Sequence, residues 1–244
     1  MKIYPDIPYR GELMLDIYAP DTEGYTTFVW MHGGGMESGS RRDARALAEN
    51  TAKYGCGFVS VEYRMYPAAR YPDFVQDAAD AVAFVQKHIG EYGGNGNVVV
   101  TGQSAGAYLT MMLYANPAFL RNAFADPGKI TAFVSDSAQV TTHFNVLRER
   151  GIDSRAERID EAAPLYYTDK LLDPKPLLLL WYADDMPCRP EQNRLMLKSL
   201  TRINTDAVVK GVELAGGHCA GSSVKDADGE FPYIKEAVRF LRSL

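Results

Sequence analysis

The 244-residue sequence has few cysteines, no excess of basic residues and no long hydrophobic run. Its three cysteines, Cys56, Cys188 and Cys219, are widely spaced without a CxxC pair, so neither a disulfide framework nor a zinc site is indicated. Lys and Arg number 26 against 31 Asp and Glu, which gives a net charge of -5 and no basic stripe. Because such a surface repels a phosphate backbone, we expect no nucleic-acid partner.

The amino-terminal segment lacks the apolar core of a secretory signal, and no apolar run approaches the length of a membrane span. Three cysteines at wide spacing also suit a reducing compartment. We therefore expect a cytoplasmic protein that does not interact with a membrane, although a trimmed chain would read in the same way.

The chain length is compatible with a single α/β domain over residues 1–244. Apolar, β-rich runs alternate with helical patterns, which is typical of a mostly parallel central sheet flanked by helices. Several runs are apolar throughout, as strands covered on both faces should be. We expect strands at residues 13–18, 26–31, 57–63, 97–101, 130–135, 177–182 and 207–214.

The clearest amphipathic helix lies between the third and fourth expected strands. Apolar residues recur at helical spacing from Phe74 to Ile89, and Pro72 stands where proline is favourable at a helix start. Residues 91–97, rich in Gly and Asn, should end this helix and lead into the next strand. Further helices are expected at residues 41–54, 105–115, 191–200 and 233–241.

Residues 141–169 are charged and have no continuous periodicity. They lie between two expected strands, where an insertion can be accommodated. We expect a lid or pocket wall there.

The strongest local motif is Gly-x-Ser-x-Gly at residues 102–106, which follows an apolar run and precedes a helical pattern. A strand, a sharp turn and a helix in this order form a nucleophile elbow, in which flanking glycines permit a turn tight enough to expose the serine oxygen. The adjacent helix N-terminus favours developing negative charge. Ser104 is therefore the candidate nucleophile.

A run of three glycines follows His32, directly after the expected strand that ends at Met31. Alone, the run could be an ordinary loop. Together with the elbow it has a function, because its backbone N–H groups and that of Ala105 can form an oxyanion hole. His32 would then brace the loop rather than act as a base.

A serine nucleophile needs a histidine base and a carboxylate that orients it. In this fold the order along the chain is nucleophile, acid, histidine, and only His218 follows a plausible acid. Asp184 and Asp185, directly after the expected strand at 177–182, compete for the role of the acid. Asp136, after the preceding strand, is a third candidate.

With these residues identified, nearly the whole chain resembles the hormone-sensitive-lipase-like esterases and the related acetyl esterase, feruloyl esterase and kynurenine formamidase-like branches of the α/β-hydrolase fold. The motifs that carry the resemblance are residues 15–20 (LDIYAP), 32–35 (HGGG), 62–67 (EYRMYP) with Tyr71-Pro72, 102–106, Asp185 and His218.

The resemblance implies three further assignments. Asp185 is preferred to Asp184, because Pro187 and Gln192 follow it at the spacing seen in these branches. Gly34 and Gly35 are the preferred oxyanion donors beside Ala105, with Gly33 an alternative. Larger relatives carry a helical cap before the first strand, and here too few residues precede it, so we expect a minimal cap and a more open site.

The activity expected from these features is hydrolysis of short-chain carboxylic esters, such as acetyl esters of sugars or other small alcohols, through an acyl-enzyme on Ser104. Neither a metal nor another cofactor is required. Amide cleavage of the aryl formamidase type is the main alternative, and a non-catalytic binding module on the same fold is the other. The sequence is compatible with a homo-oligomer as well as with a monomer.

Overall fold

The computed structural model describes all residues from 1 to 244, and its centre is one eight-stranded sheet in the order β1-β2-β4-β3-β5-β6-β7-β8. The strands β3 to β8 are parallel to one another. At one edge of the sheet, β2 pairs antiparallel with β4, and β1 pairs antiparallel with β2. The strands are β1 (Lys2–Arg10), β2 (Leu13–Ala19), β3 (Tyr25–Met31), β4 (Gly57–Val61), β5 (Gly94–Gln103), β6 (Ile130–Asp136), β7 (Leu177–Asp184) and β8 (Val209–Gly217).

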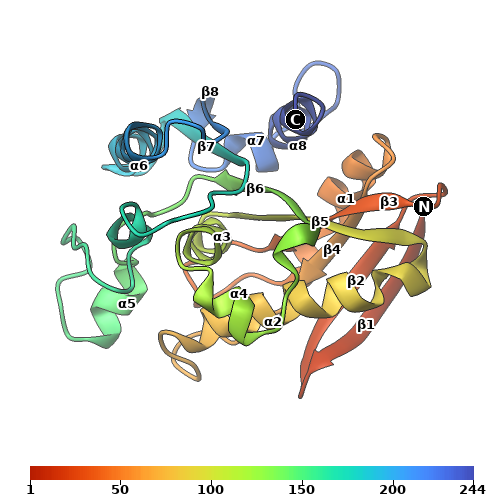
Figure 1. Ribbon diagram of the computed structural model, residues 1–244, viewed down its shortest axis with the longest axis horizontal. Coiled ribbons are helices and arrows are strands. Elements are labelled where there is room, and N and C mark those ends of the chain that lie inside the picture. Colours follow the sequence, from red (N-terminus) through yellow and green to blue (C-terminus); the bar gives the residue numbers. More distant parts are fainter.

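Helices cover both faces of the sheet (Figure 1). Residues of α2, α3 and α6 pack in the larger core on one face, and residues of α1 and α8 pack in a second core on the other face. The helices are α1 (Arg45–Ala52), α2 (Asp73–His88), α3 (Ala105–Ala115), α4 (Ala118–Asn122), α5 (Phe144–Glu149), α6 (Arg189–Ile203), α7 (Ala220–Ser223) and α8 (Pro232–Leu241), with short 3₁₀ turns η1 (Arg41–Ala44), η2 (Ile89–Tyr92), η3 (Pro127–Lys129) and η4 (Pro164–Tyr167).

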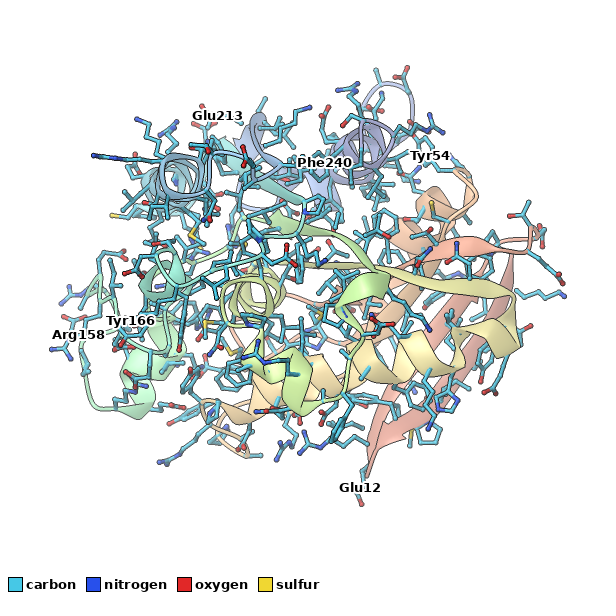
Figure 2. All side chains as sticks on the ribbon, viewed as in Figure 1. Glu12, Tyr54, Arg158, Tyr166, Glu213 and Phe240 are labelled. Atoms are coloured by element: carbon cyan, nitrogen blue, oxygen red, sulfur yellow. The ribbon has the colours of Figure 1, made fainter.

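Side chains fill the space between these layers (Figure 2). Phe240 of α8 is buried in the second core, whereas Glu12, in the turn between β1 and β2, is exposed. The predicted mostly parallel sheet flanked by helices is confirmed.

One strand was not predicted. Lys2–Arg10 forms β1, whereas the sequence reading placed the first strand at residue 13. Pro5 and Pro8 argue against a strand because proline cannot donate to the ladder, and only an edge strand tolerates them. The pairing of β1 with β2 is interrupted at two places, between Tyr4 and Ile7 and between Pro8 and Arg10.

Other boundaries differ in smaller ways. The predicted loop at residues 91–97 is shorter, because η2 continues to Tyr92 and β5 begins at Gly94. The predicted helix at 41–54 is divided into η1 and α1, and α6 starts two residues earlier than expected. The short helices α4, α5 and α7 were not predicted, because each has too few turns to produce a periodic pattern.

Candidate active site

Ser104 lies in a sharp turn between β5 and α3, with φ 53° and ψ −114°. The glycines on either side leave no room for a side chain. A Cβ on Gly106 would lie 2.0 Å from the backbone oxygen of Met31, and one on Gly102 would lie 2.4 Å from the carbonyl carbon of Gly106. The elbow therefore requires glycine at both positions, because the turn is pressed against β3 and the start of α3.

Three predicted residues meet in an unbroken chain of hydrogen bonds. His218 Nε2 lies 2.8 Å from Ser104 Oγ, and His218 Nδ1 lies 2.6 Å from Asp185 Oδ1. Ser104 follows β5, Asp185 follows β7 and His218 follows β8. The carboxyl ends of these parallel strands share one edge of the sheet, which brings together side chains as many as 114 positions apart.

Asp185 and its neighbour Asp184 have different surroundings. The Asp185 side chain is fully buried and also accepts hydrogen bonds from the Ser137 hydroxyl and from the Met186 backbone N–H. Burial alone would raise the pKa of Asp185, but the hydrogen bonds from His218, Ser137 and Met186 outweigh it and lower the pKa, so the group is a carboxylate at neutral pH. Asp184 is exposed and makes no hydrogen bond with His218.

Ser137 was missed by the sequence reading. It directly follows β6, the neighbour of β7, and has φ 63°. The buried Arg189 donates a hydrogen bond from Nη1 to the Ser137 carbonyl oxygen at 2.7 Å, which fixes this turn. The only sequence signal was its position after a strand at the same sheet edge.

Asp136, the third candidate acid, does not reach His218. Its Oδ1 accepts a hydrogen bond from the Tyr182 hydroxyl at 2.7 Å, and that hydroxyl accepts one from the Gly221 backbone N–H at 3.0 Å. Burial raises the pKa of Asp136 to about 6. Asp136 thus braces the segment that follows His218, and its backbone oxygen accepts the Ser104 N–H at 2.8 Å.

The glycine loop lies beside the elbow. A Cβ on Gly33 would be 3.3 Å from Ser104 Cβ. Gly34 and Gly35 have left-handed backbones, with φ 108° and 65°, and their N–H groups donate to no acceptor within the chain. The N–H of Ala105, the first residue of α3, is one of the donors that a helix start leaves without an intrahelical partner.

His32 has the surroundings of a bracing residue. It is buried, its Nδ1 lies 2.7 Å from the Gly33 carbonyl oxygen, and its ring stacks on Tyr63 at 4.4 Å. Burial lowers the pKa of His32, so the ring is neutral and cannot accept a proton readily.

The inserted segment 141–169 contains α5 and η4 and packs on α3 through the Tyr108 hydroxyl, which donates to the Ala162 carbonyl oxygen at 2.8 Å. Gln192, which the resemblance had associated with the acid, instead contacts this region. Its Oε1 accepts the Val140 N–H at 3.0 Å, and its Nε2 donates to Glu157 at 2.9 Å.

The described side chains contain no group of three or more His, Cys, Asp or Glu residues that could hold a metal ion. No helix of the chain combines the length and the apolar character needed to cross a membrane.

Comparison with known proteins supports the same architecture. The family model described as BD-FAE matches residues 15–147. The acetyl esterases of Salmonella typhi and Salmonella agona (strain SL483) are 28% identical over 129 residues, which cover 52% of this chain and 39% of theirs. The match thus spans well under half of the length of these curated relatives.

Solved structures cover nearly the whole chain. Thermogutta terrifontis esterase 2 phosphoramylated by tabun superposes with a TM-score of 0.78 at 20% identity, over 99% of this chain and 94% of that one. The esterase of Pyrobaculum calidifontis gives 0.78 at 21% identity, over 99% and 85%. At these identities the likeness shows the fold, which is that of the α/β-hydrolases.

Proposed function

The chain belongs to the BD-FAE family. We propose that it is a serine hydrolase that cleaves short-chain carboxylic esters through an acyl-enzyme on Ser104. The observation that carries the proposal is the continuous hydrogen-bond chain from Asp185 through His218 to Ser104. A module that only binds ligands would have no need to retain all three side chains in this order.

In the first step Ser104 Oγ attacks the ester carbonyl carbon while His218 Nε2 takes its proton. The ionised Asp185 holds Nδ1–H and stabilises the imidazolium that forms. When the carbonyl is restored, the C–O bond to the alcohol breaks and His218 returns the proton to the leaving alkoxide. Water, deprotonated by the same imidazole, then attacks the acyl-enzyme and releases the carboxylic acid and Ser104.

The negative charge on the carbonyl oxygen in each tetrahedral intermediate needs donors that are already in place. We assign this role to the N–H groups of Gly34, Gly35 and Ala105. That the first two donate to no acceptor in the chain supports the assignment.

Two observations support the proposal that the substrate carries a small acyl group. The His218 side chain remains 27% exposed, as expected for a site without a large cap. On one side of the glycine loop, the Phe144 ring of α5 is so close that a Cβ on Gly35 would lie 2.9 Å from it. We therefore propose that segment 141–169 is the wall of the site and that it limits the acyl chain. The acetyl esterase names of the curated relatives agree with this size.

The test is a substrate series on the purified protein. Aryl acetates and propionates should be cleaved fastest, and rates that increase steadily toward dodecanoate would contradict the short-chain proposal. Hydrolysis of N-formylkynurenine in preference to aryl acetate would favour the aryl formamidase alternative, which uses the same triad. Failure of a fluorophosphonate probe to label Ser104 would reject the serine-hydrolase mechanism itself.

Two further proposals concern the whole molecule. We propose that residues 1–244 form a single domain, which the one continuous sheet supports. We also propose a cytoplasmic location, which the three free cysteines support.

A further inference from the structure

The turn that follows β6 is joined to the segments that carry all three candidate triad residues. The Asp136 backbone oxygen accepts the Ser104 N–H at 2.8 Å, and the Ser137 hydroxyl donates to the Asp185 carboxylate. The third segment, which carries His218, is joined to this turn through the Asp136 carboxylate and a tyrosine of β7. The hydroxyl of that tyrosine therefore lies between the turn and the segment of the proposed base.

This tyrosine, Tyr182, is fully buried near the end of β7. Its hydroxyl donates a hydrogen bond to Asp136 Oδ1 at 2.7 Å and accepts one from the Gly221 backbone N–H at 3.0 Å. A hydroxyl has a single proton to donate, so the bond to Asp136 leaves a lone pair for Gly221. Burial raises the pKa of Tyr182, as does the neighbouring Asp136, so the hydroxyl keeps its proton.

Gly221 lies three residues after His218, in the first turn of α7. A Cβ on Gly221 would lie 2.6 Å from the Tyr182 hydroxyl oxygen, so this close approach requires glycine. Between the two, Cys219 has a left-handed backbone with φ 56°, which is costly for a residue with a Cβ and persists only where the surroundings enforce it. The hydrogen bond from Gly221 to Tyr182 is one such restraint.

The His218 ring has to meet two partners at once. Its Nδ1 lies 2.6 Å from Asp185 and its Nε2 lies 2.8 Å from Ser104, yet the side chain is partly exposed. Because packing restrains a partly exposed ring on fewer sides, the backbone that carries it has to be fixed. A misplacement of about 1 Å can lower the rate of a reaction about a hundredfold.

We propose that Tyr182 is a positioning residue for His218, because its hydroxyl, oriented by the Asp136 carboxylate, fixes the backbone after His218 and so aligns the imidazole with Ser104. The proposal rests on the function proposed for this triad. The Tyr182 hydroxyl makes no hydrogen bond with any triad side chain, so it acts through Gly221. Its loss should therefore affect the chemical step more than substrate binding.

Tyr182→Phe tests the proposal, because it removes the hydroxyl and keeps the ring. The kcat for an aryl acetate should fall about tenfold with KM nearly unchanged, since the imidazole is misplaced for proton transfer while the rest of the site is intact. A fall in kcat no larger than in the control variants, or a change confined to KM, would overturn the positioning role.

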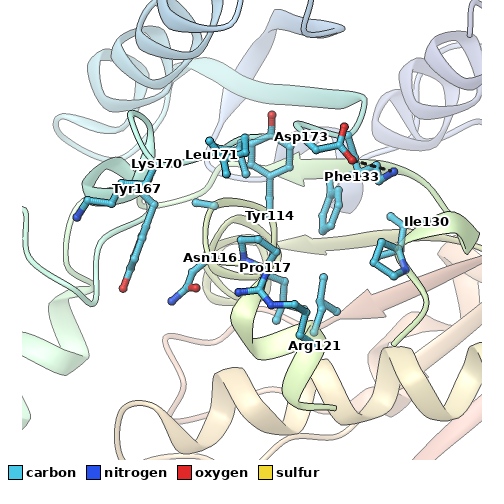
Figure 3. A pocket seen from close by; sticks show the side chains of 16 residues that line it. Tyr114, Asn116, Pro117, Arg121, Ile130, Phe133, Tyr167, Lys170, Leu171 and Asp173 are labelled. Atoms are coloured by element: carbon cyan, nitrogen blue, oxygen red, sulfur yellow. Dashed lines mark ion pairs between the residues drawn. The ribbon is translucent and has the colours of Figure 1, made fainter. Parts of the chain in front are cut away.

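Two other buried tyrosines provide matched controls. The hydroxyl of Tyr233 on α8 is hydrogen-bonded to Thr101, whereas the hydroxyl of Tyr114 has no partner. Figure 3 shows Tyr114 beside Phe133 in a cavity of about 370 Å³ at the carboxyl end of α3, and Ser104 precedes the other end of this helix. Tyr233→Phe loses a buried hydrogen bond and Tyr114→Phe loses none, and both should keep kcat within about a factor of two of wild type.

A pair of variants at Asp136 tests the orientation of the Tyr182 hydroxyl. Asp136→Asn keeps a side-chain oxygen that can accept the hydrogen bond from Tyr182, and Asp136→Leu removes the acceptor. The loss of kcat should therefore be larger in Asp136→Leu than in Asp136→Asn. Equal losses in the two variants would show that the hydrogen bond to Tyr182 has no part in positioning, and would contradict the proposal.

A spectroscopic measurement separates this proposal from the proposed esterase activity. A short hydrogen bond from His218 Nδ1–H to Asp185 gives a far-downfield resonance in the proton NMR spectrum. In Tyr182→Phe this resonance should broaden through faster exchange with water, and in Tyr233→Phe it should remain as in wild type. An unchanged resonance in Tyr182→Phe would overturn the proposal whether or not an ester is hydrolysed. Broadening in Tyr182→Phe, together with an inactive wild type, would support the positioning role and reject only the function assigned to the triad.

Discussion

Asn145 of α5 donates a hydrogen bond from its side-chain Nδ2 to the backbone carbonyl oxygen of Gly35, 3.1 Å away. This bond ties the glycine loop to the inserted segment across 110 positions of sequence. Phe144, the adjacent residue, contacts the same glycine. The position of the proposed oxyanion donors thus depends on a helix that lies outside the central sheet.

Asn145→Ala should lower kcat for an aryl acetate about tenfold with little change in KM, because a loosened loop binds the transition-state oxyanion less well than it binds the substrate. The control is Arg148→Ala, which removes a largely exposed ion pair between α5 and Glu37 and should cost little. Equal losses in the two variants, or a loss confined to KM, would contradict the positioning role of Asn145.

Ser104→Ala should lower kcat for an ester about 10⁶-fold, the loss found when the nucleophile of subtilisin is removed. The variant should keep the wild-type fold. Ser104→Gly should be as inactive but more stable than Ser104→Ala by about 1 kcal/mol, because φ 53° with ψ −114° strains any residue that has a Cβ. Kinetics and urea unfolding of both variants measure this. Residual activity above a hundredth of wild type in either one would remove Ser104 from the nucleophile role.

Asp185→Asn should reduce turnover about 10⁴-fold, because an amide favours the wrong imidazole tautomer. Asp184→Asn is the matched control, since the two residues are adjacent and only Asp185 is hydrogen-bonded to His218. Its turnover should remain within about a factor of two of wild type, since an exposed carboxylate away from the reacting atoms contributes little. The reverse ranking in steady-state kinetics would assign the acid to Asp184.

The ionisation of Asp136 should lower the free energy of unfolding as the pH rises. Its folded-state pKa, about 6, lies above the unfolded value of 3.8, so the folded protein binds more protons between these values and loses stability as the group ionises. Asp136→Asn should match wild type near pH 4 and exceed it by on the order of 3 kcal/mol at pH 8. Urea unfolding of both proteins across this range is the measurement, and a difference independent of pH would show that the carboxyl does not titrate as expected.

The sequence predicted those parts of the site that can be identified from a residue type and its position along the chain. The Gly-x-Ser-x-Gly motif after an apolar strand identified the elbow, and chain order selected His218. The carboxyl ends of parallel strands then predicted that Ser104 and His218 would lie at one edge of the sheet. These inferences need only strand order, which the alternation of patterns supplies.

Other features of the site depend on the folded geometry. Asp184 and Asp185 leave β7 in different directions, and nothing in the residues themselves states which one faces His218. Ser137 and Asn145 act through turns and helices too short to give a periodic signal. Polar residues in irregular segments are common, so their partners become evident only when the segments are packed together.

The outer edge of β1 has a consequence for behaviour in concentrated solution. An edge strand presents unpaired backbone groups on which another chain can add a strand. In β1, Pro5 and Pro8 remove two N–H donors, and the interrupted register bends the strand away from a flat template. The two prolines and the two register interruptions together make β1 a poor template for strand addition, which disfavours edge-to-edge association of folded molecules.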